Sequence, residues 1–383
     1  MTLPPVRRAD ADSARELLTA LVSIPSVNPA YDPASPGENA LGDAILEWTA
    51  GLGLEGSREP VVDGRRNIRA RLAASRSERT LLIEGHLDTV GLSPGSGTQA
   101  RVERGRLHGR GACDTKGGIA AALLAIAELA ERGLERTDVV LLGAIDEELA
   151  FRGITAAIAG GERGDAAIVL EPTDLAIVTE HNGVLRSEIL VTGRAAHTSR
   201  PEEGRNAIVD ALEVVRALEE WIARDTLEGD DTGRILAVTT IAGGSAINIV
   251  PDSCRLGVDL RIRPAEHPEG VLDELHGLLA SLPVDARVDR VLLADGGLST
   301  APTSRVVLAA QRAAGLHQLP VEAVRVPYGT DGSKLARAGI PTVVFGPGSI
   351  ADAHGDEESV ALDDVVTAAR VIRDLVLALE EFA

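Results

Sequence analysis

The sequence predicts an α/β fold with a central, mostly parallel sheet, interrupted by a smaller inserted α+β domain. Three observations support this prediction. In the first half of the chain, short β-rich runs alternate with helical stretches, as they do where helices join parallel strands. Near residue 179 the pattern changes to half-buried strands and a long amphipathic helix, and near residue 294 the first pattern returns. We therefore expect one discontinuous domain, residues 1–179 and 294–383, with residues 180–293 as the insert.

Local patterns predict the individual elements in order. The first helix starts with Ser13 and Glu16, which are spaced as a capping box, and it ends before Pro25. Residues 34–38 are expected to form a loop near the surface. The rest of the first part predicts strands at 80–84, 139–145 and 166–170 and helices at 117–132 and 153–159. The insert predicts strands at 184–192, 234–241 and 253–263 with a helix at 206–223. The last part predicts helices at 304–314 and 363–381 around a strand at 342–345.

The composition excludes several classes of partner. A net charge of −20 repels nucleic-acid phosphates, and two Trp, two Tyr and three Phe leave little surface for base stacking. No apolar run is long enough to span a bilayer, and the N-terminus lacks a secretory pattern. Two cysteines, Cys113 and Cys254, are too few for a disulfide framework. We therefore expect a cytoplasmic protein that binds neither nucleic acid nor membrane, and any metal must be held by His, Asp and Glu.

Two predicted strands end in residue types that bind metals. His86 and Asp88 follow the strand at 80–84, and Glu171 follows the strand at 166–170. Open α/β sheets place their sites at the carboxyl ends of strands. A nearby carboxylate can orient a metal-binding imidazole, whereas the alternative for His86 is a structural hydrogen bond.

Two acidic motifs and a second histidine belong to the same predicted edge. Asp114 lies in a glycine-rich turn that lacks the sequence features of a nucleotide-binding loop. Because its carboxylate is negative, the turn suits a cation better than a phosphate. The alternative for Asp114 is a helix cap. Asp146, Glu147 and Glu148 follow the strand at 139–145, where like charges require a cation unless they lie in a solvated loop. His354 follows the last strand. Such a set of nitrogen and oxygen ligands indicates a pair of divalent ions such as zinc, cobalt or manganese.

The motifs resemble those of one enzyme family along nearly the whole chain. They read Gly-His-Leu-Asp-Thr-Val, Gly-Arg-Gly-Ala-Cys-Asp-Thr-Lys-Gly-Gly, Asp-Glu-Glu, Glu-Pro-Thr, Ala-His-Thr-Ser-Arg-Pro and Ala-His-Gly-Asp-Glu. The family is that of the dinuclear zinc amidohydrolases, which includes acetylornithine deacetylase, succinyl-diaminopimelate desuccinylase and glutamate carboxypeptidase. The resemblance implies two divalent ions, zinc first and cobalt or manganese as alternatives. It implies as their ligands His86, Asp114, Glu148, Glu171 and His354.

The resemblance also implies catalytic roles. Asp114 would bridge the two ions, Asp88 would orient His86, and Glu147 would be the general base. Spacing alone does not decide which of Glu147 and Glu148 is the base and which is the ligand, so this assignment follows the family.

For the insert, the resemblance implies a lid that dimerises and contacts the substrate. His197, Asn248 and Arg261 match the family positions that contact substrate, although Arg261 could instead pair with its neighbour Asp259. After the insert, Gly329 and Thr330 match a loop that lines the substrate pocket, and the alternative for this loop is a helix cap.

The expected function is hydrolysis of an N-acyl amino acid, because the loops resemble acetylornithine deacetylase most. A dipeptidase or a glutamate-type carboxypeptidase is the alternative within the family. A non-catalytic, metal-dependent binding module is the alternative outside it, but such a module has no use for a base such as Glu147. The expected partners are an N-acyl amino acid or short peptide and a second copy of the chain, which would form a homodimer through the insert.

Overall fold

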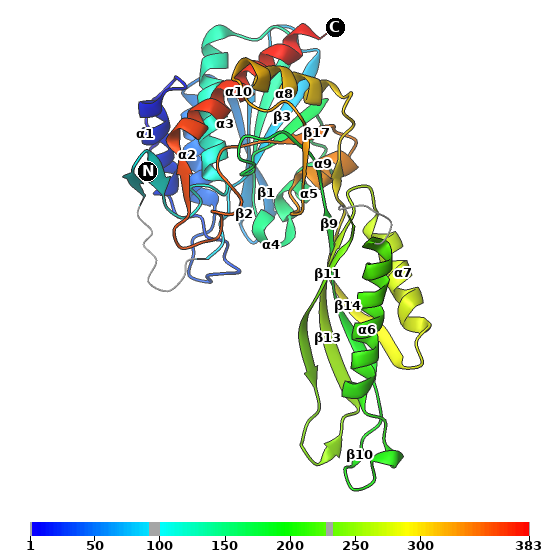
Figure 1. Cartoon of the computed structure of the whole chain (residues 1–383). Coiled ribbons are helices and arrows are strands. Elements are labelled where there is room, and N and C mark those ends of the chain that lie inside the picture. Colours follow the sequence, from blue (N-terminus) through cyan, green and yellow to red (C-terminus); the bar gives the residue numbers. More distant parts are fainter. Residues whose placement is uncertain (1, 92–99, 227–232, 383) are drawn as a thin grey trace. The chain divides into compact units, whose positions relative to one another are not determined.

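The computed structural model describes residues 2–91, 100–226 and 233–382, which form two compact units (Figure 1). The first unit comprises Met1–Thr179, Thr300–Arg325 and Thr330–Ala383. The second comprises Glu180–Ser299 and Val326–Gly329. The chain passes from the first unit to the second within strand β8 (Val178–His181).

The first unit is built on a mostly parallel sheet in the strand order β1-β2-β6-β3-β7-β17-β8. β6, β3, β7 and β17 run parallel, whereas β1 and β2 form an antiparallel hairpin at the edge. The predicted α/β fold class is therefore confirmed. The strands of this sheet before β8 are β1 (Glu55–Val62), β2 (Arg65–Leu72), β3 (Arg79–His86), β6 (Thr137–Ala144), β7 (Ala166–Val169) and β17 (Thr342–Val344). A small separate sheet contains β4 (Arg101–Glu103), β5 (Arg106–His108) and β18 (Ser359–Ala361), and β16 (Val324–Val326) pairs with β8.

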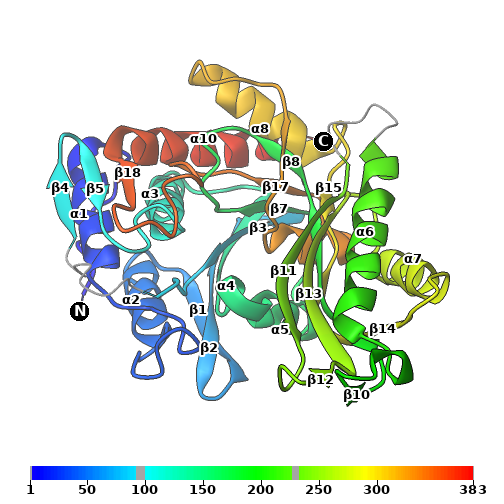
Figure 2. The same ribbon diagram turned by 60° about the horizontal axis from the view of Figure 1, so that its bottom comes forward.

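Helices cover both faces of this sheet (Figure 2). Alternate strand residues, such as Leu81 and Ile83 of β3, are buried in one apolar cluster with side chains of α1, α2, α3, α8 and α10. Because side chains alternate across a strand, Leu82 is buried on the opposite face. The helices of the unit are α1 (Ala11–Val22), α2 (Asn39–Ala50), α3 (Lys116–Arg132), α4 (Glu147–Ala150), α5 (Arg152–Ala159), α8 (Arg305–Leu316), α9 (Gly332–Arg337) and α10 (Leu362–Glu381).

The second unit is an antiparallel sheet with two helices. Its strand order is β11-β13-β9-β14, and side chains of α6 and α7 form an apolar core with the sheet. The elements are β9 (Gly183–Thr192), β10 (Ala196–His197), a short 3₁₀ helix (Pro201–Glu203), α6 (Ala207–Thr226), β11 (Ile235–Gly243), β12 (Ile249–Val250), β13 (Ser253–Ile262), α7 (Pro268–Ala280), β14 (Asp285–Asp295) and β15 (Leu298–Ser299).

One local expectation is wrong and another holds in part. The first helix is capped by Asp10, whose side chain accepts a hydrogen bond from the Ser13 amide at 2.9 Å, so Ser13 lies inside the helix. Residues 34–38 form the expected loop, with Ala34 and Pro36 exposed, but the Glu38 carboxylate at its end is fully buried against the guanidinium of Arg65. Its partner, Arg65, lies 27 residues later in the sequence, on β2. The local sequence around Glu38 does not indicate this partner.

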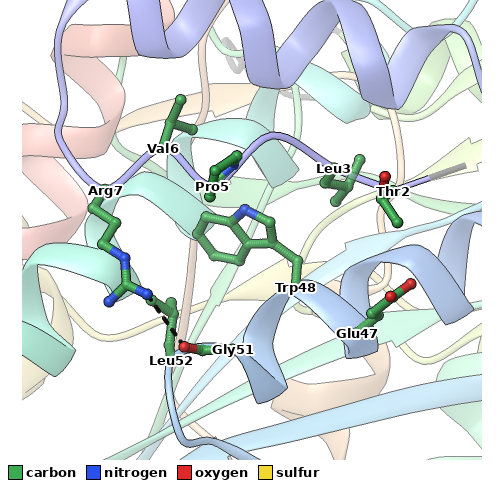
Figure 3. A pocket seen from close by; sticks show the side chains of 9 residues that line it. All are labelled: Thr2, Leu3, Pro5, Val6, Arg7, Glu47, Trp48, Gly51 and Leu52. Carbon is green, nitrogen blue, oxygen red and sulfur yellow. Dashed lines mark hydrogen bonds between the residues drawn. The ribbon is translucent and has the colours of Figure 1, made fainter.

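The segment before α1 packs against α2 around a shallow pocket (Figure 3). The indole N–H of Trp48 donates to the backbone oxygen of Pro4 at 2.7 Å, and the Arg7 guanidinium donates to the backbone oxygen of Gly51 at 3.3 Å. These two hydrogen bonds hold the N-terminal segment against α2 and the residue that follows it. Among the described residues, none of the helices combines the length and apolarity that crossing a membrane requires.

Candidate metal centre and active site

Four parallel strands bring the predicted metal-binding residues to one edge of the sheet. His86 is the last residue of β3, whose neighbours are β6 and β7. Glu148 lies on α4 just after β6, and Glu171 lies just after β7. Asp114 precedes α3, and His354 lies in the loop after β17. All five belong to the first unit.

Asp114 lies between the two imidazoles. Its Oδ1 is 2.8 Å from Nε2 of His86, and its Oδ2 is 3.1 Å from Nε2 of His354. Glu171 Oε1 lies 3.9 Å from the His86 nitrogen, and Glu148 Oε2 lies 3.1 Å from the His354 nitrogen. The cluster thus has two sides, each with one imidazole, one glutamate and one oxygen of Asp114.

The acidic and basic groups of the cluster change one another's pKa. Burial raises the pKa of Glu148 and of Glu171. Hydrogen bonds with Asp114 and Glu148 raise the pKa of His354 to about 10. Burial opposes ionisation of Asp114, but hydrogen bonds with His354 and His86 keep its pKa well below the ordinary value. Carboxylates crowded in this way favour a cation among them.

The donor atoms fit a pair of divalent metal ions. One ligand atom each from His86, Asp114 and Glu148 lies within 4.8 Å of the other two, so the two sides of the cluster lie close together. Imidazole nitrogens and carboxylate oxygens suit zinc, cobalt and manganese. The carboxylate of Asp114, with one oxygen toward each imidazole, has the arrangement of a bridging ligand.

Glu147 lies beside this cluster and is half-buried. Burial and the nearby carboxylate of Glu171 raise its pKa well above the ordinary value. A carboxylate whose pKa is raised binds a proton more readily than an ordinary glutamate, as a group that accepts a proton during catalysis must.

The carboxylate of Asp88 has different partners from those expected. The acceptor for Nδ1 of His86 is the backbone oxygen of Asp88 at 3.0 Å, while the nearer carboxylate oxygen is 3.7 Å away. The carboxylate instead accepts the backbone N–H groups of Glu147 at 3.0 Å and Glu148 at 3.3 Å. Asp88 therefore orients His86 through its main chain and holds the acidic turn through its side chain.

The predicted substrate-binding residues of the insert lie in the second unit. His197 is exposed on β10, with its Nδ1 accepting the Ser199 amide at 3.1 Å. The backbone oxygen of Asn248 accepts the Thr198 amide at 3.3 Å. Arg261 donates to Asp259 at 2.9 Å, which is the pairing considered as its alternative. Their contact with a substrate stays a prediction.

The two loop residues after the insert fall in different units. Gly329 belongs to the second unit and Thr330 to the first. Thr330 is fully buried, and its hydroxyl accepts the Gly332 amide at 3.0 Å at the start of α9. The Thr330 hydroxyl thus binds the first residue of α9 from one position before the N-cap residue Asp331, while its role toward substrate stays a prediction.

Three buried polar residues near the cluster were not identified from the sequence. Glu84 and Asp331 are buried near His86, and burial raises the pKa of Asp331 to about 6. Glu84 could have been identified from the sequence, because a glutamate that directly follows the apolar run Leu-Leu-Ile is expected to be buried. Asn28 is the third, and it contacts Asp88 and Asp146. Its loop carries no motif that points to them.

Comparisons with known proteins agree with this geometry. Residues 82–378 match the model of peptidase family M20/M25/M40. The chain is 34% identical over 319 residues to an acetylornithine deacetylase of Myxococcus xanthus, covering 80% of this chain and 82% of that protein. It is 31% identical over 365 residues to a Mycobacterium tuberculosis protein provisionally named succinyl-diaminopimelate desuccinylase, covering 94% and 96%.

A solved structure with the same fold is that of a Bacillus subtilis protein described as a dinuclear metal-binding peptidase. The TM-score is 0.72 at 16% identity, over 97% of this chain and 99% of that chain. At 16% identity, this similarity shows only that the two chains share a fold.

Replacing His86 or His354 with Ala should lower metal content. Each substitution removes one imidazole from one side of Asp114, so we expect fewer than two ions per chain or at least about a tenfold loss of affinity. Elemental analysis after dialysis and calorimetric titration with zinc measure this. His276→Ala, which changes an exposed histidine on α7, is the control. Two tightly bound ions in both variants would show that these histidines are not ligands.

Proposed function

The chain belongs to peptidase family M20/M25/M40, and we propose that within this family it hydrolyses the amide bond of an N-acyl amino acid. The two-sided cluster around Asp114, with Glu147 beside it, carries the proposal. Membership of the family makes the protein a metal-dependent hydrolase. The similarity to an acetylornithine deacetylase supports an acetylated amino acid as the substrate class.

We propose that each side of the cluster holds one divalent ion. His86 and Glu171 would hold one, His354 and Glu148 would hold the other, and Asp114 would contribute one oxygen to each. Zinc is the proposed metal, with cobalt or manganese as alternatives, because the ligands are nitrogen and oxygen only. Bound there, two divalent ions lower the pKa of a water molecule and polarise an amide carbonyl.

Glu147 is the proposed general base. It takes a proton from the attacking water as the water oxygen forms a bond to the carbonyl carbon. When the carbon–nitrogen bond breaks, Glu147 returns the proton to the leaving nitrogen. The products are a carboxylate and a free amine. Asp88 supports this step by binding the backbone amide of Glu147 at 3.0 Å.

The second unit is proposed as a lid and as the contact with a second copy of the chain. His197 is exposed, as a residue that closes onto a substrate held elsewhere must be. Exposed apolar side chains lie on β11, one of the two edge strands of its sheet, and on α6. They are Ile235, Ile241, Val209 and Leu212. Such a surface favours a homodimer.

The proposed location of the protein is the cytoplasm, as expected from the sequence. Cys113 and Cys254 are both free and buried, which is compatible with the reducing conditions of the cytoplasm.

A substrate screen tests the proposed function. Protein loaded with zinc, cobalt or manganese is incubated with N-acetyl amino acids, N-succinyl amino acids and dipeptides, and the released amine is measured with ninhydrin. We expect acetylated amino acids to be hydrolysed fastest and a chelator to abolish turnover. Preferential cleavage of dipeptides would favour the peptidase alternative. Failure to cleave any of them with two ions bound would contradict the proposal and favour a binding module.

Glu147→Gln should separate the base from the ligands. Glutamine keeps the size of the side chain but cannot accept the proton, so kcat should fall by roughly 10²–10⁴ while both ions stay bound. Glu148→Gln is the matched variant on the adjacent residue, and it should lose metal. If Glu148→Gln keeps its metal and loses kcat while Glu147→Gln stays active, the two roles are reversed.

His197→Ala should lower kcat with normal metal content. Loss of one donor to the oxyanion of the tetrahedral intermediate costs on the order of 10²–10³ in kcat. If His197 acts in the partner's site, mixing inactive His197→Ala with inactive Glu147→Gln should restore activity in hybrid dimers. A fully active His197→Ala enzyme would exclude the donor role, and inactive hybrids would place His197 in its own subunit's site.

A further inference from the structure

Asn28 is a fully buried side chain that lies between two carboxylates. Its amide nitrogen is 2.8 Å from Oδ2 of Asp88 and 2.9 Å from Oδ1 of Asp146. Both carboxylates are themselves buried. An ionised carboxylate only accepts hydrogen bonds, so the two N–H groups of the Asn28 amide serve one carboxylate each. Asn28 thus links two buried carboxylates.

The two linked carboxylates belong to the turn that carries the proposed base. Asp88 accepts the backbone N–H groups of Glu147 and Glu148, the first two residues of α4. Asp146, just before them, has a left-handed backbone with φ of 67°, and its own side chain does not cap α4. The cap of this short helix is therefore supplied from outside, by Asp88.

Arginines neutralise only one of the two carboxylates. Arg152 donates to Asp146 at 2.6 and 3.0 Å, and Arg65 donates to it at 3.1 Å. Burial opposes the ionisation of Asp146, but the bonds from Arg152 and Asn28 keep its pKa below the ordinary value. No arginine or lysine pairs with Asp88 in the part of the chain that the structure describes, so its bonds are to the two backbone amides and to Asn28.

The backbone around Asn28 is itself fixed. The backbone N–H of Asn28 donates to the backbone oxygen of Thr89 at 2.9 Å, and Thr89 directly follows Asp88. The Asn28 side-chain oxygen accepts the Ala30 amide at 3.1 Å, and its backbone oxygen accepts the Tyr31 amide at 2.9 Å. From the same loop, the Tyr31 hydroxyl donates to the backbone oxygen of Glu148 at 2.8 Å. A rigid loop therefore presents Asn28 to the acidic turn.

We infer that Asn28 is a positioning residue, which through Asp88 holds the turn of Glu147 and Glu148 in its active conformation. Without the Asn28 donor, Oδ2 of the buried Asp88 carboxylate loses its only hydrogen bond from a side chain among the described residues, and an unsatisfied buried carboxylate oxygen is costly. We expect the Asp88 carboxylate to rotate toward other donors and to release the two backbone amides. Displacement of a catalytic group by about 1 Å can lower the rate by about 10²-fold. The catalytic part of this inference rests on the proposed hydrolysis.

The test is Asn28→Leu, which keeps the approximate shape of the side chain and removes both donors. We expect kcat to fall by at least tenfold, with KM and metal content within about twofold of the wild-type values. We also expect faster hydrogen exchange at the amides of Glu147 and Glu148. Asn28→Ala, which is smaller, serves if the leucine variant does not fold.

Glu380→Leu is the matched control. Glu380 accepts the backbone amides of Glu135 at 2.7 Å and Arg136 at 3.0 Å just before β6, at the end of that strand opposite to the acidic turn. We expect it to lower thermal stability without changing kcat or exchange at residues 147 and 148. Wild-type kcat in Asn28→Leu, or an equal effect of Glu380→Leu on kcat and exchange, would overturn the inference. If the wild-type protein hydrolyses no amide substrate, the proposed function fails, and hydrogen exchange alone decides the positioning role.

Discussion

Like charges buried at one edge of the parallel sheet impose the main constraint on this protein. The strand ends bring several carboxylates into a space where water cannot screen them, which favours partners that neutralise or hydrogen-bond them. The structure uses three kinds of partner: imidazoles at Asp114, arginines at Asp146, and N–H groups at Asp88. The buried salt bridge of Glu38 with Arg65 belongs to the same system, because Arg65 also contacts Asp146. The geometry of the candidate active site is thus an outcome of charge neutralisation.

The parts of the fold and of the site that the sequence predicted depend on local patterns. Apolar runs such as β6 and the long buried helix α3 have a clear period and length, so their positions were predicted within a few residues. The metal-binding cluster followed from a rule of topology, because the carboxyl ends of parallel strands meet at one edge. The assignment of ligand pairs to Glu148 and Glu171 required the structure, since β3 lies between β6 and β7, and strand order alone leaves both glutamates beside His86.

The parts that the sequence did not predict depend on contacts between distant residues. Asn28 lies 60 residues before Asp88 and 118 before Asp146, and none of the three is marked by a pattern that involves the others. The expected bond from the Asp88 carboxylate to His86 assumed an extended chain. In the structure the main chain of Asp88 takes that bond, so the carboxylate is available to the turn after β6. Local spacing indicates which residues are near, but the competition among hydrogen-bond donors decides which atoms pair.

The discontinuity of the first unit has a consequence for biosynthesis. Strand β17 pairs with β7, yet the whole second unit is synthesised between them. Four residues of the cluster therefore leave the ribosome before His354, the fifth. Between Glu171 and His354 the ribosome needs roughly 10–40 s at about 5–20 residues per second. During that interval the nascent chain carries an acidic cluster without its second imidazole, so the complete two-ion centre can be loaded only after the second unit has been translated.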